Sequence, residues 1–237
     1  IIGSTHTADE GAGKKEPLSK KEKERMGAII LVSALSVIFW LFYYQQDLAL
    51  VIYMTDYVKM SLGSFEIAPS WITTTWNGLL CVVLGGVMAA IWKKLAERPQ
   101  GDMNMFKKVG LGFLFVGLAF GVMVLCELFR GVGADASVKA SVLWPILFSA
   151  VITVGEMCFS PLRNAFVSKY APKKYLSLLM GVIAVSTFVA NKLSPYVQAF
   201  IEKFDVFPVF VGIFVIMMAF TALLFAANKQ LNKLVED

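Results

Sequence analysis

Six long apolar segments, separated by short polar connections, constrain the possible fold of this chain more than any other feature. A helix needs about 20 consecutive, mostly apolar residues to cross the hydrocarbon core of a bilayer. The connections carry glycine, proline and charged residues, and none is long enough to form an additional domain. The sequence therefore predicts an all-α membrane protein with transmembrane helices at residues 27–55, 69–92, 108–129, 142–168, 175–200 and 206–228.

Composition agrees with this prediction and excludes several other classes of protein. Hydrophobic residues make up 57% of the 237 residues, compared with about 45–50% in ordinary soluble domains. Cys81, Cys126, Cys158 and the single histidine, His6, show none of the spacings of metal or haem sites. The net charge of +5 comes from Lys and Arg between the apolar segments, where membrane topology explains it. We therefore expect no metal, no organic cofactor and no nucleic-acid partner.

The distribution of Lys and Arg predicts the orientation of the chain. Sixteen of them fall in the two tails and in the second and fourth connections, whereas only four fall in the other three connections. Because basic connections remain in the cytoplasm, both termini are expected there. We expect a polar N-terminal linker at residues 1–26, a six-helix bundle at 27–228 and a C-terminal tail at 229–237. The linker begins at Ile1 and lacks the apolar core of a signal peptide, so it is interpreted as flexible or as the cut end of a longer protein.

Polar side chains inside the apolar segments are the candidate functional residues. Each is costly at membrane depth unless it has a partner or faces a water-filled cavity. They fall in four places: Tyr43, Tyr44, Gln45, Gln46 and Asp47; Thr73, Thr74, Thr75 and Asn77; Glu156, Ser160, Arg163 and Asn164; and Asn191 with Lys192.

Glu156 is the strongest candidate, because it lies near the centre of a 27-residue apolar stretch and so close to the bilayer midplane. A carboxylate there is protonated, paired with a cation or hydrated. A structural ion pair with Lys192 and a role in binding or proton transfer both remain open. Similarly, Gln45 and Asp47 are consistent with a polar cavity and with hydrogen bonds that only join helices.

Small residues and one proline bear on how the helices pack. Gly85 and Gly86, and the series Gly110, Gly112, Gly117 and Gly121, would let neighbouring helices approach closely. Pro161 permits a kink, which suits a helix that bends during transport but also occurs in static helices.

Several motifs resemble the proton-dependent oligopeptide transporter (POT/PTR) family of the major facilitator fold. Gly155 to Pro161, Val167 to Lys173 and Leu179 to Val182 resemble the family's helices ten and eleven. Phe39 to Gln46 is similar to its helix seven, and Pro69 to Asn77 is similar to its helix eight. The resemblance, which spans nearly all of residues 27–228, implies one half of a twelve-helix transporter, built as a 3+3 inverted repeat.

The resemblance also assigns roles to individual residues. It implies that Glu156 and Asn77 bind the substrate. Tyr44, Gln45 and Ser160 are further candidates for substrate binding among the polar residues of the apolar segments. Glu156, Asp47 and Lys192 are then the candidates for proton coupling or an ion pair, with the proton as the coupling ion. Tyr44 departs from the family, because it stands where helix seven carries a glutamate and a phenol titrates only near pH 10.

Two functions follow from these observations. The first is half of a proton-coupled transporter for di- and tripeptides or peptide-like solutes, completed by a second six-helix chain that carries the family's Glu-x-x-Glu-Arg motif. The second is a membrane scaffold subunit that descends from such a half but no longer transports. Loss of the helix-seven glutamate favours the second, and retention of Glu156 favours the first. An enzyme is the weakest class, since no segment carries an intramembrane histidine or a Ser/His pair.

Overall fold

The computed structural model describes residues 17–99 and 101–236, and within them it has six helical spans long and apolar enough to cross a membrane. The first span consists of α1, the 3₁₀ turn η1 and α2; the second consists of the π-helical turn η2 and α3. The elements are α1 (Lys20–Tyr43), η1 (Tyr44–Gln46), α2 (Ala49–Tyr57), η2 (Trp71–Trp76), α3 (Asn77–Ala96), α4 (Met105–Arg130), α5 (Leu143–Tyr170), η3 (Lys173–Tyr175), α6 (Leu176–Ile201) and α7 (Val206–Asn232). The six predicted spans are therefore confirmed.

The boundaries of the first and last spans differ from the prediction. Helix α1 begins at Lys20 because Ser19 and Glu22 form a capping box that satisfies backbone N–H groups of the first turn. Helix α7 continues to Asn232, into the predicted tail. Residues 1–16 of the predicted linker, with His6, lie outside the described residues.

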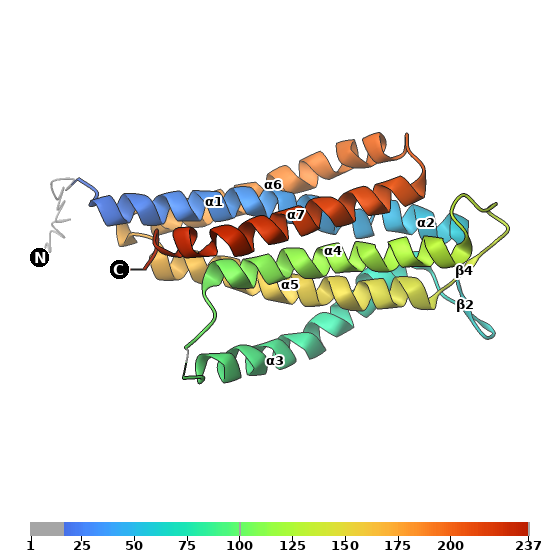
Figure 1. Ribbon diagram of the computed structural model, residues 1–237, viewed down its shortest axis with the longest axis horizontal. Coiled ribbons are helices and arrows are strands. Elements are labelled where there is room, and N and C mark those ends of the chain that lie inside the picture. The colour runs from blue at the N-terminus through green and yellow to red at the C-terminus, as the bar shows by residue number, and fades with distance from the viewer. Residues whose placement is uncertain (1–16, 100, 237) are drawn as a thin grey trace, which may run out of the picture.

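The six spans form two sets of three in sequence order. The first set is α1 with α2, α3 and α4, and the second set is α5, α6 and α7. Helix α1 packs on α6, its counterpart α5 packs on α3, and α4 packs on α7 (Figure 1). Exchanging the two sets reproduces these pairs, as expected for the predicted inverted repeat. Helix α5 also packs along α4 and touches α1, so α1, α4 and α5 surround the centre of the bundle.

Glycines of α4 let its neighbours come close, as predicted. A Cβ atom at Gly112 would lie 3.0 Å from the Cβ of Phe159, and one at Gly155 would lie 3.0 Å from the carbonyl oxygen of Gly112. A Cβ atom at Gly110 or Gly121 would press against a phenylalanine ring of α7. Helix α4 therefore packs closely against both α5 and α7 at these glycines.

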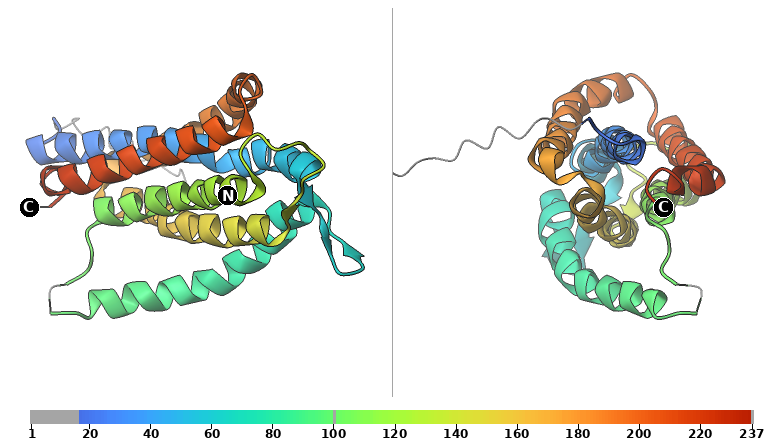
Figure 2. Two further views of the ribbon diagram at one scale, coloured as in Figure 1. Left: turned by 45° about the vertical axis from the view of Figure 1, so that its right-hand side comes forward. Right: turned by 90° about the vertical axis from the view of Figure 1, so that its left-hand side faces the viewer.

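Helix α3 behaves differently, because it has no buried residue. Near its own N-terminal end α3 crosses α5, and it then leaves the bundle (Figure 1). Two further views show the same separation (Figure 2). A Cβ atom at Gly85 or Gly86 would meet nothing within 4 Å. The predicted close approach at these two glycines therefore has no partner in the described part of the chain.

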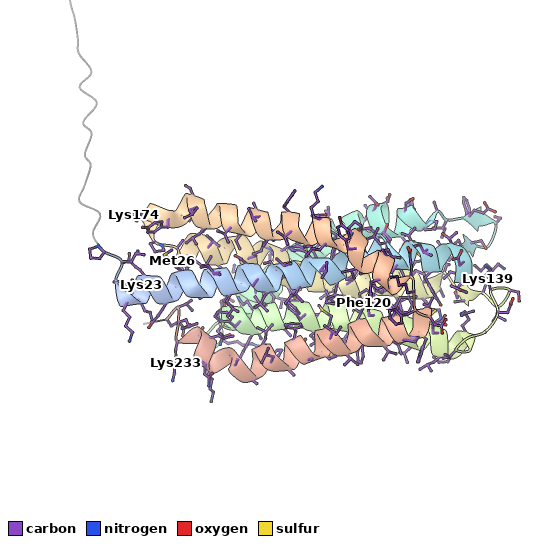
Figure 3. All side chains as sticks on the ribbon, turned by 90° about the horizontal axis from the view of Figure 1, so that it is seen from above. Lys23, Met26, Phe120, Lys139, Lys174 and Lys233 are labelled. Carbon is purple, nitrogen blue, oxygen red and sulfur yellow. The ribbon has the colours of Figure 1, made fainter. Side chains whose placement is uncertain are left out.

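Basic side chains gather at one end of the bundle. Figure 3 shows Lys23, Lys174 and Lys233 at one end and Lys139 at the other. The first end also holds the start of α1 and the end of α7, where Lys21 Nζ donates to the carbonyl of Lys233 at 3.1 Å. This separation supports the charge count, and the cytoplasmic assignment of that end remains a prediction.

A buried ion pair organises the opposite end. Arg130, at the end of α4, donates from Nε and Nη2 to the two carboxylate oxygens of Glu127, at 2.7 and 3.0 Å. Tyr53 of α2 donates to Glu127 at 2.5 Å, and Arg130 also donates to the carbonyl of Ala134 at 3.0 Å. Short strands lie beside this cluster: β1 (Val58–Lys59) pairs with β4 (Ala140–Ser141), and β2 (Ser61–Leu62) pairs with β3 (Phe65–Glu66).

Candidate functional site

Glu156 lies at the middle of α5, half-buried, and accepts a hydrogen bond from the hydroxyl of Tyr43. Cys81 Sγ of α3 lies 3.6 Å from the same carboxylate oxygen. The carboxylate therefore meets α1 and α3 as well as its own helix. Glu156 is only half-buried, at the depth predicted for the membrane midplane.

Asn77 extends this network. Its Nδ2 donates to Thr153 Oγ1 at 2.8 Å and lies 3.4 Å from the Tyr43 hydroxyl oxygen. Thr153 in turn donates to the carbonyl of Ser149 at 2.6 Å. Asn77 and Glu156, which sequence reasoning placed in one site, are thus joined through Tyr43.

Local irregularities in two helices position these groups. The first span breaks at residues 44–48, directly after Tyr43, where a 3₁₀ turn replaces the α-helix. The second span starts with the π-helical turn η2, which ends just before Asn77 and stacks Trp71 on Trp76 with ring centroids 6.4 Å apart. Irregular turns of this kind are frequent at functional sites. The sequence predicted continuous helices here, because an apolar run carries no signal for such breaks.

A cluster of aromatic rings supports Tyr43. Phe39 stacks on Phe159 at 4.0 Å between ring centroids, and Phe113 meets Phe39 edge-on at 5.6 Å. Tyr43 lies one turn above Phe39 and is itself buried. Since the Tyr43 ring is packed on this cluster, its hydroxyl is held toward Glu156.

A second polar group joins the first span to α5 and α6. The hydroxyl oxygen of Tyr44 accepts from Asn191 Nδ2 of α6 at 3.1 Å, and its ring stacks on Trp40 at 5.5 Å. Arg163 of α5 lies over the ring of Trp40, with Cζ 5.7 Å from the ring centroid. Its Nη1 donates to Thr187 Oγ1 at 2.7 Å. Tyr44 is therefore close to the site, held by neutral and aromatic contacts.

Two predicted site residues, Gln45 and Lys192, lie outside this arrangement, and Asp47 lies at its edge. Gln45 is fully buried, and its side chain donates to the carbonyl of Leu41 at 3.1 Å. This hydrogen bond satisfies a backbone group of its own span beside the break. Asp47 is exposed beside the same break, where its carboxylate lies near Thr73 and within electrostatic reach of Glu156. Lys192 is exposed with its Nζ over the ring of Phe188, and it forms no ion pair with Glu156. The structure does not form the ion pair between Glu156 and Lys192, because the Lys192 side chain extends along α6, and a role for Lys192 stays a prediction.

Ser160 is half-buried one helical turn from Glu156, as the motif suggested. Sequence reasoning missed Thr153, Cys81 and the ionised pair at the other end, Glu127 with Arg130. Spacing offered a signal for the first two: Thr153 precedes Glu156 by three residues, and Cys81 follows Asn77 by four. The carboxylate of Glu127 was overlooked because it lies near the end of an apolar segment.

Comparisons with known proteins agree on one family. The family model described as PTR2, POT family, matches residues 12–216. An uncharacterised transporter of Bacillus subtilis, YclF, is 28% identical over 184 residues, covering 78% of this chain and 36% of the relative. The peptide transporter YePEPT of Yersinia enterocolitica is 24% identical over 195 residues, covering 81% and 37%. A di-/tripeptide transporter of Lactococcus lactis is 28% identical over 182 residues, covering 75% and 34%.

Solved structures give the same result for the fold. A crystal structure of a peptide transporter POT in complex with sulfate superposes with a TM-score of 0.80 at 22% identity, covering 94% of this chain and 44% of that one. A POT family transporter in complex with a thioalcohol-conjugated peptide gives 0.80 at 22% identity. The chain thus has the fold of one half of these transporters and spans little more than a third of the length of the curated relatives.

Proposed function

The chain belongs to the POT family, and we propose that it is one half of a proton-coupled transporter for di- and tripeptides or peptide-like solutes, working with a second six-helix bundle. The observation that carries the proposal is the half-buried Glu156 carboxylate, held by Tyr43 and backed by Asn77 at the membrane midplane. A carboxylate at this depth attracts a substrate ammonium group or a proton, since either neutralises it in a medium of low polarity.

The names of the relatives supply the substrate class. Those from Yersinia and Lactococcus are called peptide and di-/tripeptide transporters, and one structural neighbour holds a conjugated peptide. The ammonium group at the start of a peptide is the cation that Glu156 receives. Asn77 and Ser160 then contribute hydrogen bonds to the peptide backbone.

The incomplete burial of Glu156 and Asn77 supports a second bundle. The network joins α1, α3 and α5. Helices α3 and α6 also carry large exposed apolar side chains, such as Val82, Val83, Phe188 and Tyr196. Polar groups at membrane depth that face lipid have no hydrogen-bond partners. A second bundle seated on α3 and α6 would enclose Glu156, and the two would rock around the site as in other secondary transporters.

Transport by the native assembly tests the proposal. The tagged chain is purified from its own membranes with the proteins that accompany it and is reconstituted into liposomes. We expect an inward proton gradient to drive uptake of labelled dialanine, and we expect a protonophore or excess unlabelled dipeptide to abolish it. If the assembly neither binds nor accumulates peptides, the scaffold function, which Tyr44 favours by replacing the helix-seven glutamate, is correct instead.

A further inference from the structure

Two adjoining cavities lie between α6 and α7, toward the end of the bundle where Figure 3 shows Lys139. The outer cavity, nearer this end, has a volume of about 200 Å³ and is lined by residues of α2, the end of α6 and the start of α7. The inner cavity has a volume of about 460 Å³ and is lined by α6, α7 and Phe42 of α1. Ile201, Phe204 and Val209 line both cavities. The two cavities therefore form one groove along α6 and α7.

The outer cavity carries two carboxylates and an unpaired amide oxygen. Asp56 and Glu202 line it, and neither forms an ion pair within the described residues. Gln198, which is only 8% exposed, donates from Nε2 to Glu202 Oε1 at 3.0 Å. The Oε1 atom of Gln198 receives no hydrogen bond from the described part of the chain. Because buried acceptors in native proteins have donors, these three side chains together suit a cation that donates hydrogen bonds.

A cationic side chain lies at the rim of the same cavity. Lys139 Nζ donates to the backbone carbonyl of Asp56 at 2.5 Å, and this lysine has no ion pair within residues 17–99 and 101–236. An ammonium group has three donors, so two remain for another acceptor. The rim thus offers one positive group beside two negative groups. This arrangement is complementary to a ligand that carries an anion and a cation close together.

The inner cavity is lined by apolar residues only. The rings of Phe200 and Phe204 lie 5.0 Å apart between centroids and are 61% and 52% exposed, so both face out of the bundle. Gly212 leaves the wall of α7 open, because a Cβ atom there would meet nothing within 4 Å. Within a membrane-spanning bundle such a surface meets lipid hydrocarbon instead of water. The inner cavity therefore suits an acyl chain.

We propose that the groove binds an aminophospholipid, a phospholipid whose head group ends in a primary ammonium, such as phosphatidylethanolamine. One acyl chain lies in the inner cavity, the phosphate lies at Lys139, and the ammonium lies at Asp56 and Glu202. Phosphatidylcholine carries methyl groups in place of the ammonium N–H donors, and phosphatidylglycerol lacks the cation, so each matches only part of the groove. Glu156 does not line the groove, and the lipid site does not rest on the proposed function.

Titration with three lipids that share their acyl chains tests this inference. The chain is purified in detergent with the proteins that accompany it and is titrated with dioleoyl phosphatidylethanolamine, phosphatidylcholine or phosphatidylglycerol. Native mass spectrometry counts the bound lipid and gives the dissociation constant. The variants are Asp56→Asn combined with Glu202→Gln, Lys139→Gln and Gly212→Leu. Glu66→Gln, at an exposed glutamate of β3, is the matched control.

We expect the parent protein to bind phosphatidylethanolamine about tenfold more tightly than phosphatidylcholine, the gain typical of hydrogen bonds to charged groups. Asp56→Asn with Glu202→Gln should abolish this preference and leave the affinity for phosphatidylcholine unchanged. Lys139→Gln should weaken all three lipids by a similar factor, because each carries a phosphate. Gly212→Leu should also weaken all three, because the new side chain fills the inner cavity. Glu66→Gln should bind as the parent does.

Equal affinities of the parent protein for the three lipids, or tightest binding of phosphatidylglycerol, would overturn the inference. A preference for phosphatidylethanolamine that survives Asp56→Asn with Glu202→Gln would also overturn it, as would unchanged lipid binding in Gly212→Leu. Lipid that binds only after an accompanying protein is removed would show that a partner helix fills the groove instead. Melting temperatures without added lipid show whether each variant is folded. If the double variant is not, Glu202→Gln alone must lose part of the preference.

Discussion

The hydroxyl of Tyr43 donates a hydrogen bond to the carboxylate of Glu156, joining residues that are 113 positions apart in the sequence. The bond connects α1 with α5, the first helices of the two sets of three. It fixes the carboxylate on the side of α5 that faces α1 and α3. In the proposed transporter this contact decides where the ammonium group of a peptide is received.

Removing this hydroxyl is expected to weaken peptide binding. Tyr43→Phe keeps the ring on Phe39 but leaves the Glu156 carboxylate without its donor, and a hydrogen bond to a charged group contributes about 1.5–3 kcal/mol. We therefore expect the dissociation constant for dialanine to rise about tenfold or more, measured by calorimetry on the native assembly. Tyr170→Phe, at the half-buried tyrosine that ends α5, is the control and should have no effect. An unchanged affinity in Tyr43→Phe would show that the bond does not position Glu156 for binding.

The close approach of α4 and α5 is expected to tolerate no side chain at Gly155. A Cβ atom there would lie 3.0 Å from the carbonyl oxygen of Gly112 and 3.1 Å from the backbone nitrogen of Val116, and backbone atoms cannot move aside as a flexible side chain does. Gly155→Ala should therefore lower stability by about 1–3 kcal/mol, seen as a lower melting temperature in detergent. Gly86→Ala is the matched control, because a Cβ atom there meets nothing within 4 Å. Equal melting temperatures for the two variants would contradict this packing.

The ion pair at the other end of the bundle is expected to stabilise the connection that follows α4. The side chains of Glu127 and Arg130 are only 2% and 3% exposed, so Glu127→Gln leaves a buried guanidinium without its counter-charge. Breaking a buried pair in this way typically costs about 3–5 kcal/mol. We expect a marked drop in melting temperature and faster proteolysis between residues 131 and 142, because Arg130 also holds carbonyl groups of that segment. Glu66→Gln, at an exposed glutamate, should change neither property.

Labelling of single cysteines tests the orientation of the bundle in the membrane. In a background without the three native cysteines, residues introduced at Gly63 and Asp135 should react with a membrane-impermeant reagent from outside the cell. A cysteine at Gly101, at the end that holds most of the Lys and Arg, should react only after the membrane is opened. Reaction of position 101 in intact cells would reverse the predicted orientation.

Transport by the isolated chain tests whether one bundle is sufficient. Liposomes that contain only this chain should not accumulate labelled dipeptide under an inward proton gradient, because alternating access needs two bundles around one cavity. Tyr44 adds a chemical reason, since the glutamate expected to exchange the proton is replaced by a phenol that accepts a hydrogen bond from Asn191. Accumulation that Glu156→Gln abolishes would show that the chain transports by itself, for example as a homodimer.

The order and number of spans could be predicted from the sequence because each depends on local composition. A run of apolar residues partitions into the membrane wherever it lies in the chain, and its backbone groups must then bond within the helix. The same reasoning identified Glu156 and Asn77 as candidates, since a polar residue in such a run stands out without any knowledge of its neighbours. The glycines of α4 were identified by the same local argument.

The partners of these residues were decided only by the tertiary structure. Tyr43 and Arg163 were visible as polar residues, but which of them meets Glu156 depends on how α1, α5 and α6 cross and on the break that follows Tyr43. The same crossing directs Gln45 into its own helix and Lys192 along α6, although both share a sequence neighbourhood with residues of the site. Local composition determines whether a segment enters the membrane, whereas the direction of each side chain follows from helix packing, which joins residues more than a hundred positions apart.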